Sequence, residues 1–104
     1  MNIKGNIPLL ILHVLSTRPK HGYQIVKEIK RRSGGVLDVA EGTLYPILHD
    51  MEKRKQIEAF EETVNGRQRR CYRLTEAGQR TLATQTAEWK RYTKAVDLVL
   101  GGAS

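Results

Sequence analysis

The sequence predicts a mainly helical α+β fold that contains one β-hairpin and ends in a long helix. Apolar residues recur at helical spacing in three segments within the first 55 residues. The pair Asn65-Gly66 separates two strand-like segments, and apolar residues recur at seven-residue intervals after residue 76. A chain of 104 residues is long enough for one domain with one modest core.

Two helices are predicted at the start of the chain. Residues 1–6 are expected to form a flexible arm. Pro8 suits the first turn of a helix over residues 9–16, because a proline lacks the N–H that would have no partner there. Pro19 ends this helix, since proline disfavours the helical conformation in the residue before it. A second helix over residues 22–32 ends at a pair of glycines.

Residues 36–39 alternate apolar and polar, which predicts a short strand. Residues 41–55 then predict a third helix with two unlike faces. Its apolar stripe consists of Leu44, Ile47, Leu48 and Met51. The other side carries Thr43, Tyr45, Pro46, His49 and Lys53. A tyrosine and a proline on an outward helix face indicate a surface that meets another molecule.

The Asn65-Gly66 pair predicts a two-residue hairpin turn, because both central residues of a type I′ turn need positive φ. This turn places residues opposite each other when their numbers add up to 131. The pairs are Glu62 with Arg69, Glu61 with Arg70, Glu58 with Arg73 and Ile57 with Leu74. Each pair of opposite charges contributes about 0.2–1 kcal/mol. Arg67 has no acidic partner in this register and is expected to be the freest cation.

Thr75 is predicted to cap a final helix that runs from Glu76 to about Leu100 and ends at two glycines. An apolar seam follows one side of it, with Gln85 as a polar exception. The seam consists of Leu82, Trp89, Tyr92, Val96 and Val99. A domain of about 75 residues offers no obvious place to bury this seam, so a second copy of the chain is predicted to cover it in a two-fold dimer.

The charge of the chain favours a polyanionic partner. There are 18 Lys and Arg residues against 11 Asp and Glu, which gives a net charge of +7. Residues 1–33 hold seven bases and one acid, whereas residues 34–104 hold eleven bases and ten acids. Basic side chains release counterions when they contact phosphates. A basic protein without such a partner is the alternative, and charge alone leaves the two readings open.

No enzymatic or metal site is predicted. The three histidines lie on separate elements, no ligand spacing joins them to Cys71, and no nucleophile–base arrangement or phosphate-binding glycine loop is present. A single cysteine fits a reducing cytoplasm. The apolar run over residues 7–15 is too short to cross a membrane, and no cofactor is expected.

The order helix, helix, strand, helix, hairpin is that of a winged helix-turn-helix. In this arrangement the third helix enters the major groove of DNA and the hairpin, or wing, reaches the neighbouring backbone. The two-faced helix over residues 41–55 meets this requirement. The alternative is a small α+β domain that uses the same surfaces to bind protein.

Four segments resemble the PadR family of bacterial transcriptional regulators, over residues 5 to about 80. They are Pro8-Leu9-Leu10-Ile11-Leu12, His21-Gly22-Tyr23, Gly42-Thr43-Leu44-Tyr45-Pro46 and Arg69-Arg70-Cys71-Tyr72-Arg73-Leu74-Thr75-Glu76-Ala77-Gly78. The chain departs from the family pattern at Cys71, which is usually aromatic, and at Gln68, which is often proline.

The resemblance implies a homodimeric repressor in which each winged helix reads one half of an inverted repeat, with half-sites roughly 10 bp apart. It places Tyr45 and Pro46 against DNA, flanked by Thr43 and His49, and it places Lys53 over a phosphate. Residues implied on the DNA backbone are Tyr23 and Lys27, with Lys20, Arg67 and Arg69 as general phosphate candidates. Simple solvent exposure explains any one of these bases or His49 equally well, and Tyr23 could instead cover the core of its helix.

The short form of this family has one long dimerising helix. By this resemblance residues 1–75 form a winged-helix DNA-binding domain and residues 76–104 a C-terminal dimerisation helix. Multidrug-responsive relatives stack flat aromatic ligands on a tryptophan in this region, which makes Trp89 a candidate for binding a small aromatic effector; the alternative is an interface anchor. The expected function is a signal-responsive repressor, with a winged-helix protein-interaction module as the alternative. The operator and the effector are not specified by the sequence.

Overall fold

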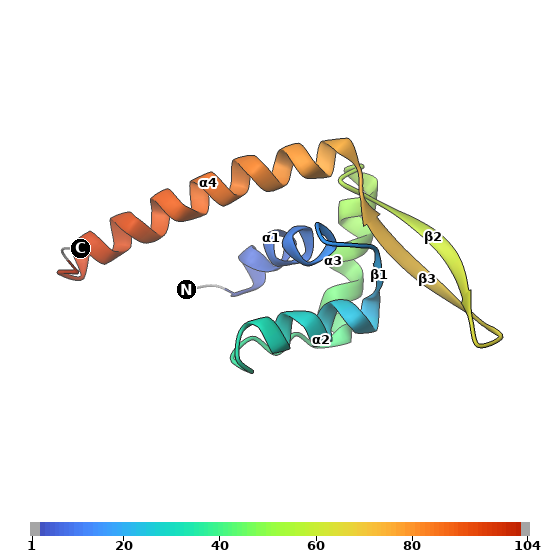
Figure 1. Ribbon diagram of the computed structural model, residues 1–104. Helices are drawn as coiled ribbons and strands as arrows, with labels where there is room; N and C mark the ends of the chain where they lie inside the picture. The colour runs from blue at the N-terminus through green and yellow to red at the C-terminus, as the bar shows by residue number, and fades with distance from the viewer. Residues whose placement is uncertain (1–2, 103–104) are drawn as a thin grey trace.

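The computed structural model describes residues 3–102, and this part of the chain forms four helices and a three-stranded antiparallel sheet (Figure 1). The elements are α1 (Ile3–Leu15), β1 (Lys20–His21), α2 (Gly22–Arg32), α3 (Glu41–Lys53), β2 (Ile57–Val64), β3 (Arg67–Leu74) and α4 (Glu76–Val99). The strand order is β1-β3-β2. The predicted mainly helical α+β fold with a terminal long helix is therefore confirmed.

The core lies where α1, α2 and α3 meet the base of the sheet. Its largest fully buried side chains are Ile7, Ile11, Leu12, Ile25, Leu44, Leu48, Met51 and Ile57. Each such burial contributes roughly 1.5–3 kcal/mol. Leu44, Leu48 and Met51 belong to the predicted apolar stripe of α3, so the opposite side of α3 is left facing outward.

The first helix is longer than predicted. Helix α1 begins at Ile3, so the expectation of a flexible arm is wrong for residues 3–6, while residues 1–2 lie outside the described part. Pro8 lies within the helix rather than in its first turn. Ile7 is buried just before it. Tertiary packing therefore holds turns that helix propensity and the missing proline N–H disfavour.

Residues 36–39 do not form the predicted strand. This segment is an extended connection without strand partners, in which Val39 is buried and Val36 is exposed. The alternating pattern in the sequence therefore reflects burial of one side of this segment and does not indicate that it pairs with a strand. The third strand is instead β1, whose two residues pair with Tyr72 and Cys71 of β3. It joins the start of α2 to the wing.

The hairpin has the predicted register, which pairs Ile57 with Leu74 and continues without a bulge to Val64 and Arg67. Asn65 and Gly66 have φ values of 52° and 76°, as a type I′ turn requires. Figure 1 shows the hairpin extending away from the helices.

Helix α4 starts at a tight joint with the end of α3. Thr75 is its N-cap, as predicted: the Thr75 Oγ1 accepts the Gly78 N–H at 3.0 Å and donates to the Lys55 carbonyl at 2.6 Å. The Thr75 N–H donates to the Gln56 carbonyl at 3.2 Å. Gly78 lies so close to this same carbonyl that any Cβ there would overlap it. The first turn of α4 is therefore fixed on the turn that follows α3.

The first half of α4 packs on α1, and its second half projects past the core (Figure 1). Leu82 packs against the chain's own core, and the His13 Nε2 lies 2.8 Å from the Thr86 Oγ1. Because that hydroxyl donates to the Leu82 carbonyl at 2.6 Å, it accepts from His13. Further along, Tyr92 is exposed and the Val99 side chain is 86% exposed.

Candidate nucleic-acid interface

The outward face of α3 carries the residues that the sequence placed there. Tyr45 is 44% exposed, Pro46 and His49 are exposed, and Thr43 is half-buried. Lys53 is exposed at the C-terminal end of the helix. One side of α3 is thus held in the core and the other presents an aromatic ring, a proline and an imidazole to solvent.

Tyr45 also contacts α2. A Cβ built on Gly22 would lie 2.5 Å from the Tyr45 Oη and 2.8 Å from two of its ring carbons. The ring therefore lies directly against the backbone at the start of α2, and any larger residue at Gly22 would displace it. This contact fixes the orientation of the ring on the outward face. Sequence reasoning included Gly22 in a motif but did not detect its contact with Tyr45.

The start of α2 forms one flank of this face. The Tyr23 ring is 53% exposed, so it does not cover the core of α2. The Lys27 Nζ lies 5.3 Å from the centre of that ring, which is a cation–π distance. The Tyr23 ring also lies parallel to the His21 imidazole, with centroids 6.4 Å apart.

The wing forms the other flank, and its arginines divide into two groups. Arg73 pairs with Glu58 at 2.7 Å, and Arg70 pairs with Glu52 of α3 at 3.1 Å as well as with Glu61 at 3.8 Å. Glu52 raises the pKa of Arg70. These charges are neutralised within the chain.

Arg67 and Arg69 form the second group, because neither has an ion pair among residues 3–102. The expected pair of Arg69 with Glu62 has the predicted Cα register but is not formed as an ion pair. The Glu62 carboxylate accepts instead from the Cys71 thiol at 3.2 Å, and the Arg69 Nη1 lies 2.8 Å from the His21 Nε2.

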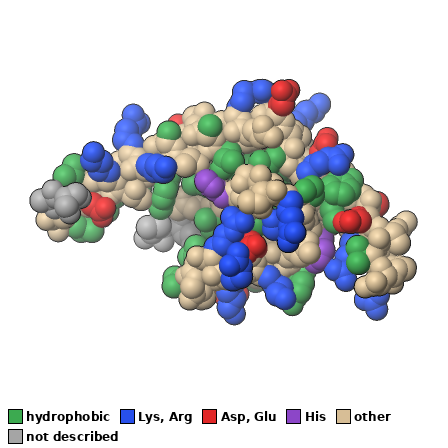
Figure 2. Space-filling model, in the orientation of Figure 1, with side chains coloured by type: hydrophobic (Ala, Val, Ile, Leu, Met, Phe, Trp, Pro, Cys, Tyr) green, Lys and Arg blue, Asp and Glu red, His purple; other side chains and the backbone are tan. Residues whose placement is uncertain are grey.

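A cleft of about 490 Å³ joins the two flanks. It is lined by His21, Gly22, Tyr23, Tyr45, Arg67, Gln68, Arg69, Arg70 and Tyr72. Figure 2 shows Lys and Arg side chains gathered over α2 and beside the wing. The exposed face of α3 therefore lies between surfaces that carry positive charge.

Lys20 is the one phosphate candidate that the structure removes. Its side chain is buried, with 5% of the residue exposed. The Nζ donates to the Val14 carbonyl at 2.9 Å and to the Thr17 Oγ1 at 3.0 Å, at the C-terminal end of α1. Burial, followed by the charge of Arg18, lowers the pKa of Lys20. Lys20 caps α1, where a cation interacts favourably with the helix dipole, and is not available to DNA.

Cys71 is a structural residue. Its side chain is buried at the base of the wing, and burial together with Glu62 raises the pKa of the thiol to about 11. The thiol is therefore protonated at neutral pH and donates to Glu62. Within residues 3–102, no group of three His, Cys, Asp or Glu residues could hold a metal ion. No helix in that range is long and apolar enough to cross a membrane.

Three helices, a short strand and a two-stranded wing define a winged helix-turn-helix protein with a long additional helix. The chain belongs to the PadR-like family of transcriptional regulators, whose family model matches residues 11–84. The resemblance seen in the sequence is thereby confirmed.

Relatives match the chain over nearly its whole length. The transcriptional regulator Rv3488 of Mycobacterium tuberculosis is 35% identical over 101 residues, which are 97% of this chain and 89% of that protein. A PadR family transcription regulator from Clostridium difficile has a TM-score of 0.82 and 29% identity, covering 91% of this chain and 98% of that one.

Bacillus subtilis PadR, solved in complex with operator DNA, shares the fold. Its TM-score is 0.70 and its identity 21%, covering 77% of this chain and 45% of that one.

Proposed function

We propose that this regulator is a homodimeric repressor that binds an inverted-repeat operator, with one α3 in the major groove of each half-site. The observation that carries the proposal is the exposed face of α3 between two flanks whose cations lack carboxylate partners in the described part of the chain: Lys27 on α2, and Arg67 and Arg69 on the wing. Base edges specify sequence, and phosphate contacts on either side fix the register.

The roles follow from exposure and reach. Tyr45, Pro46 and His49 are outward on α3 and are assigned to the groove, with Thr43 beside them. Tyr23, Lys27, Arg67 and Arg69 are assigned to the backbone on the two flanks. Lys53 lies at the opposite end of α3 from Thr43, so its assignment is to a phosphate at the groove edge.

A selection of bound sequences from random duplex DNA, followed by affinity measurements at several salt concentrations, tests this function. The expected result is an inverted repeat whose binding falls steeply with salt, because each phosphate contact releases counterions. A winged-helix module that binds protein is the competing function. It predicts no enriched sequence and weak, indiscriminate binding to duplexes.

Replacing Arg67 by alanine should weaken binding to all duplex sequences alike and reduce the salt slope by about one per contact. Arg67 is exposed beside the turn of the wing and is not paired within residues 3–102. Arg91→Ala, an exposed arginine on α4, is the matched control and should leave the slope unchanged. A loss confined to particular operator bases would contradict a phosphate role for Arg67.

The homodimer is proposed from the second half of α4. Tyr92 and Val99 are exposed there, and Val96 and Trp89 are half-buried on the same side of the helix. Leu82 contributes less to this surface because it packs on its own core. A second copy of the same helix would bury these side chains across a two-fold axis.

Val99→Glu is expected to give monomers in sedimentation experiments. The residue is 86% exposed, so the charge should spare the core of the single chain while it disrupts an apolar interface. Lys94→Glu, on the opposite side of α4, should remain dimeric. If Val99→Glu dimerised with the same affinity as the wild type, the dimer interface would have to lie elsewhere.

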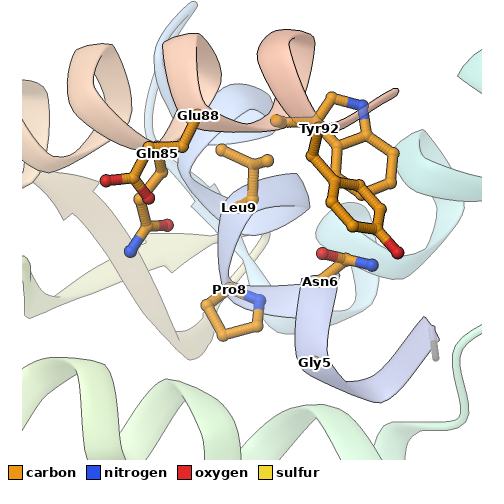
Figure 3. Close-up of a pocket in the computed structure, with 8 residues that line it drawn as sticks. Gly5, Asn6, Pro8, Leu9, Gln85, Glu88 and Tyr92 are labelled. Carbon is orange, nitrogen blue, oxygen red and sulfur yellow. The ribbon is translucent and has the colours of Figure 1, made fainter. Parts of the chain in front are cut away.

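We propose further that a flat aromatic effector regulates the dimer at Trp89. A cavity of about 490 Å³ lies between α1 and α4, with Leu9 and Tyr92 in its lining (Figure 3). The Trp89 and Tyr92 rings are 5.9 Å apart and inclined by 34°. A ligand that favours one arrangement of the dimer needs only about 1–3 kcal/mol of coupling to lower operator affinity about 5–150-fold. An interface anchor without ligand is the competing role for Trp89.

Trp89 is the only tryptophan of the chain, so all tryptophan fluorescence comes from this position. Saturable quenching by aromatic compounds, accompanied by release of operator DNA, is the expected result for an effector site. Quenching without any change in operator binding would leave Trp89 as an interface anchor.

A further inference from the structure

The imidazole of His21 lies between two hydrogen-bond donors. The Gln24 backbone N–H points at Nδ1 with a separation of 3.4 Å, as part of the cap of α2. On the other side, the Arg69 Nη1 lies 2.8 Å from Nε2. A neutral imidazole has one N–H and one lone pair, so it can accept from only one of them. One of the two nitrogens must direct its own N–H toward a donor.

Protonation does not resolve this conflict, since an imidazolium has an N–H on both sides. The charged and titratable groups that face His21 are Arg69 on β3, Glu62 on β2 and Tyr23 on α2. Burial and then Arg69 lower the pKa of His21, while Glu62 opposes them. The imidazole is therefore neutral at neutral pH.

On the side that faces the cleft, Arg69 has no carboxylate acceptor among the described residues. Glu62, which faces Arg69 across the hairpin, is engaged by the Cys71 thiol, and Arg69 has no carboxylate within 4.0 Å among the described residues. The cleft beside them is lined by arginines, by the Tyr23 ring and by the Tyr45 ring on the outward face of α3. The Arg69 guanidinium and the His21 Nε2 thus lie side by side at this cleft.

We infer that His21 and Arg69 together bind one phosphodiester of the DNA backbone. One phosphate oxygen accepts from the Arg69 guanidinium and another from the His21 Nε2–H, while Nδ1 accepts from the Gln24 N–H. Every donor then has an acceptor, and the charged bonds are of the stronger class. This inference rests on the proposed DNA-binding function and adds a contact residue, His21, that joins α2 to the wing.

The inference has a spectroscopic consequence. Without DNA the shorter contact to Arg69 favours the tautomer with its proton on Nδ1, because Nε2 then accepts. With the phosphate bound, the proton moves to Nε2. Imidazole ¹⁵N shifts of the whole dimer, with and without operator duplex, distinguish the two tautomers. In a second measurement, inorganic phosphate replaces the operator duplex at the same concentration. It is expected to leave the His21 tautomer unchanged.

The binding experiment uses operator duplexes in which single phosphates are replaced by neutral methylphosphonates. His21→Asn retains a side-chain oxygen for the cap of α2 but lacks the donor at Nε2. Arg69→Gln removes the charge of the exposed arginine, and Arg91→Gln on α4 is the matched control. At one position per half-site, the methylphosphonate should weaken wild-type and Arg91→Gln binding about tenfold. It should weaken His21→Asn and Arg69→Gln binding less, because each of these variants retains only one of the two donors.

Each outcome decides a separate claim. If the wild-type dimer binds no duplex, the proposed function fails and this contact fails with it. If it binds, but every methylphosphonate weakens the wild type and both variants equally, the phosphate contact alone is overturned. An unchanged tautomer on DNA also overturns it, and an equal tautomer change with inorganic phosphate would overturn the assignment to DNA. Circular dichroism of each variant checks that α2 remains folded.

Discussion

Replacing Gly78 by alanine is expected to destabilise the protein by about 3 kcal/mol, the upper end of the usual range for overpacking. Gly78 is buried in the first turn of α4, and an added Cβ would overlap the Gln56 carbonyl oxygen. This oxygen is backbone and also accepts the Thr75 N–H, so it cannot move as a flexible side chain would. Urea denaturation at a fixed protein concentration measures the loss.

Gly42→Ala is the control for this substitution. Gly42 lies in the first turn of α3, and a Cβ built there meets no atom within 4 Å beyond its chain neighbours and the nearby backbone of α3 among the described residues. Alanine in a helix is favoured over glycine by up to about 1 kcal/mol, so this variant should be as stable as the wild type or more stable. If Gly78→Ala and Gly42→Ala had equal stability, the joint between α3 and α4 would be looser than its geometry indicates.

Tyr45→Ala is expected to lower operator affinity at least about 30-fold, because each lost specific contact is worth roughly 1–3 kcal/mol and a dimer loses two. The ring is 44% exposed on the outward face of α3 and rests on the Gly22 backbone. Its removal takes away both the groove contact and the support between α3 and α2. Competition titrations with operator and unrelated duplexes would show a loss of discrimination rather than of charge-driven binding.

Tyr45→Phe separates the two contributions. The phenylalanine ring retains the packing on Gly22 but lacks the hydroxyl, so the operator affinity of this variant reports the contribution of the hydroxyl group alone. Sedimentation and circular dichroism should show a folded dimer for both variants. Unchanged operator affinity of Tyr45→Ala would remove this face of α3 from sequence reading.

Local rules predicted the parts of the fold in which neighbours in sequence decide the structure. The Asn65-Gly66 turn needs positive φ at both residues, and counting from it gave the whole strand register. The end of α2 follows from the glycines after it, and Thr75 was recognisable as a cap. The two faces of α3 were equally visible, since its apolar stripe has helical spacing.

Partners distant in sequence were not predictable in this way. Residues 36–39 have a strand-like pattern, yet β3 pairs with Lys20 and His21 instead. Lys20 has the composition of a phosphate ligand but lies buried at the end of α1. The hairpin register places Glu62 opposite Arg69, but a thiol on β3 takes the carboxylate. These outcomes depend on side-chain positions that spacing does not specify.

The joint at Gly78 gives the long helix a mechanical property. Helix α4 has 24 residues and is therefore about 36 Å long. Its first turn is held against the turn after α3. In the proposed dimer, α4 and the recognition helix α3 would therefore move together as one rigid unit. A tilt of about 5° at the far end displaces the other end by about 3 Å, close to the 3.4 Å rise of one base pair. A ligand that slightly changes the angle between the two α4 helices of the dimer would thus shift the two α3 helices relative to their half-sites.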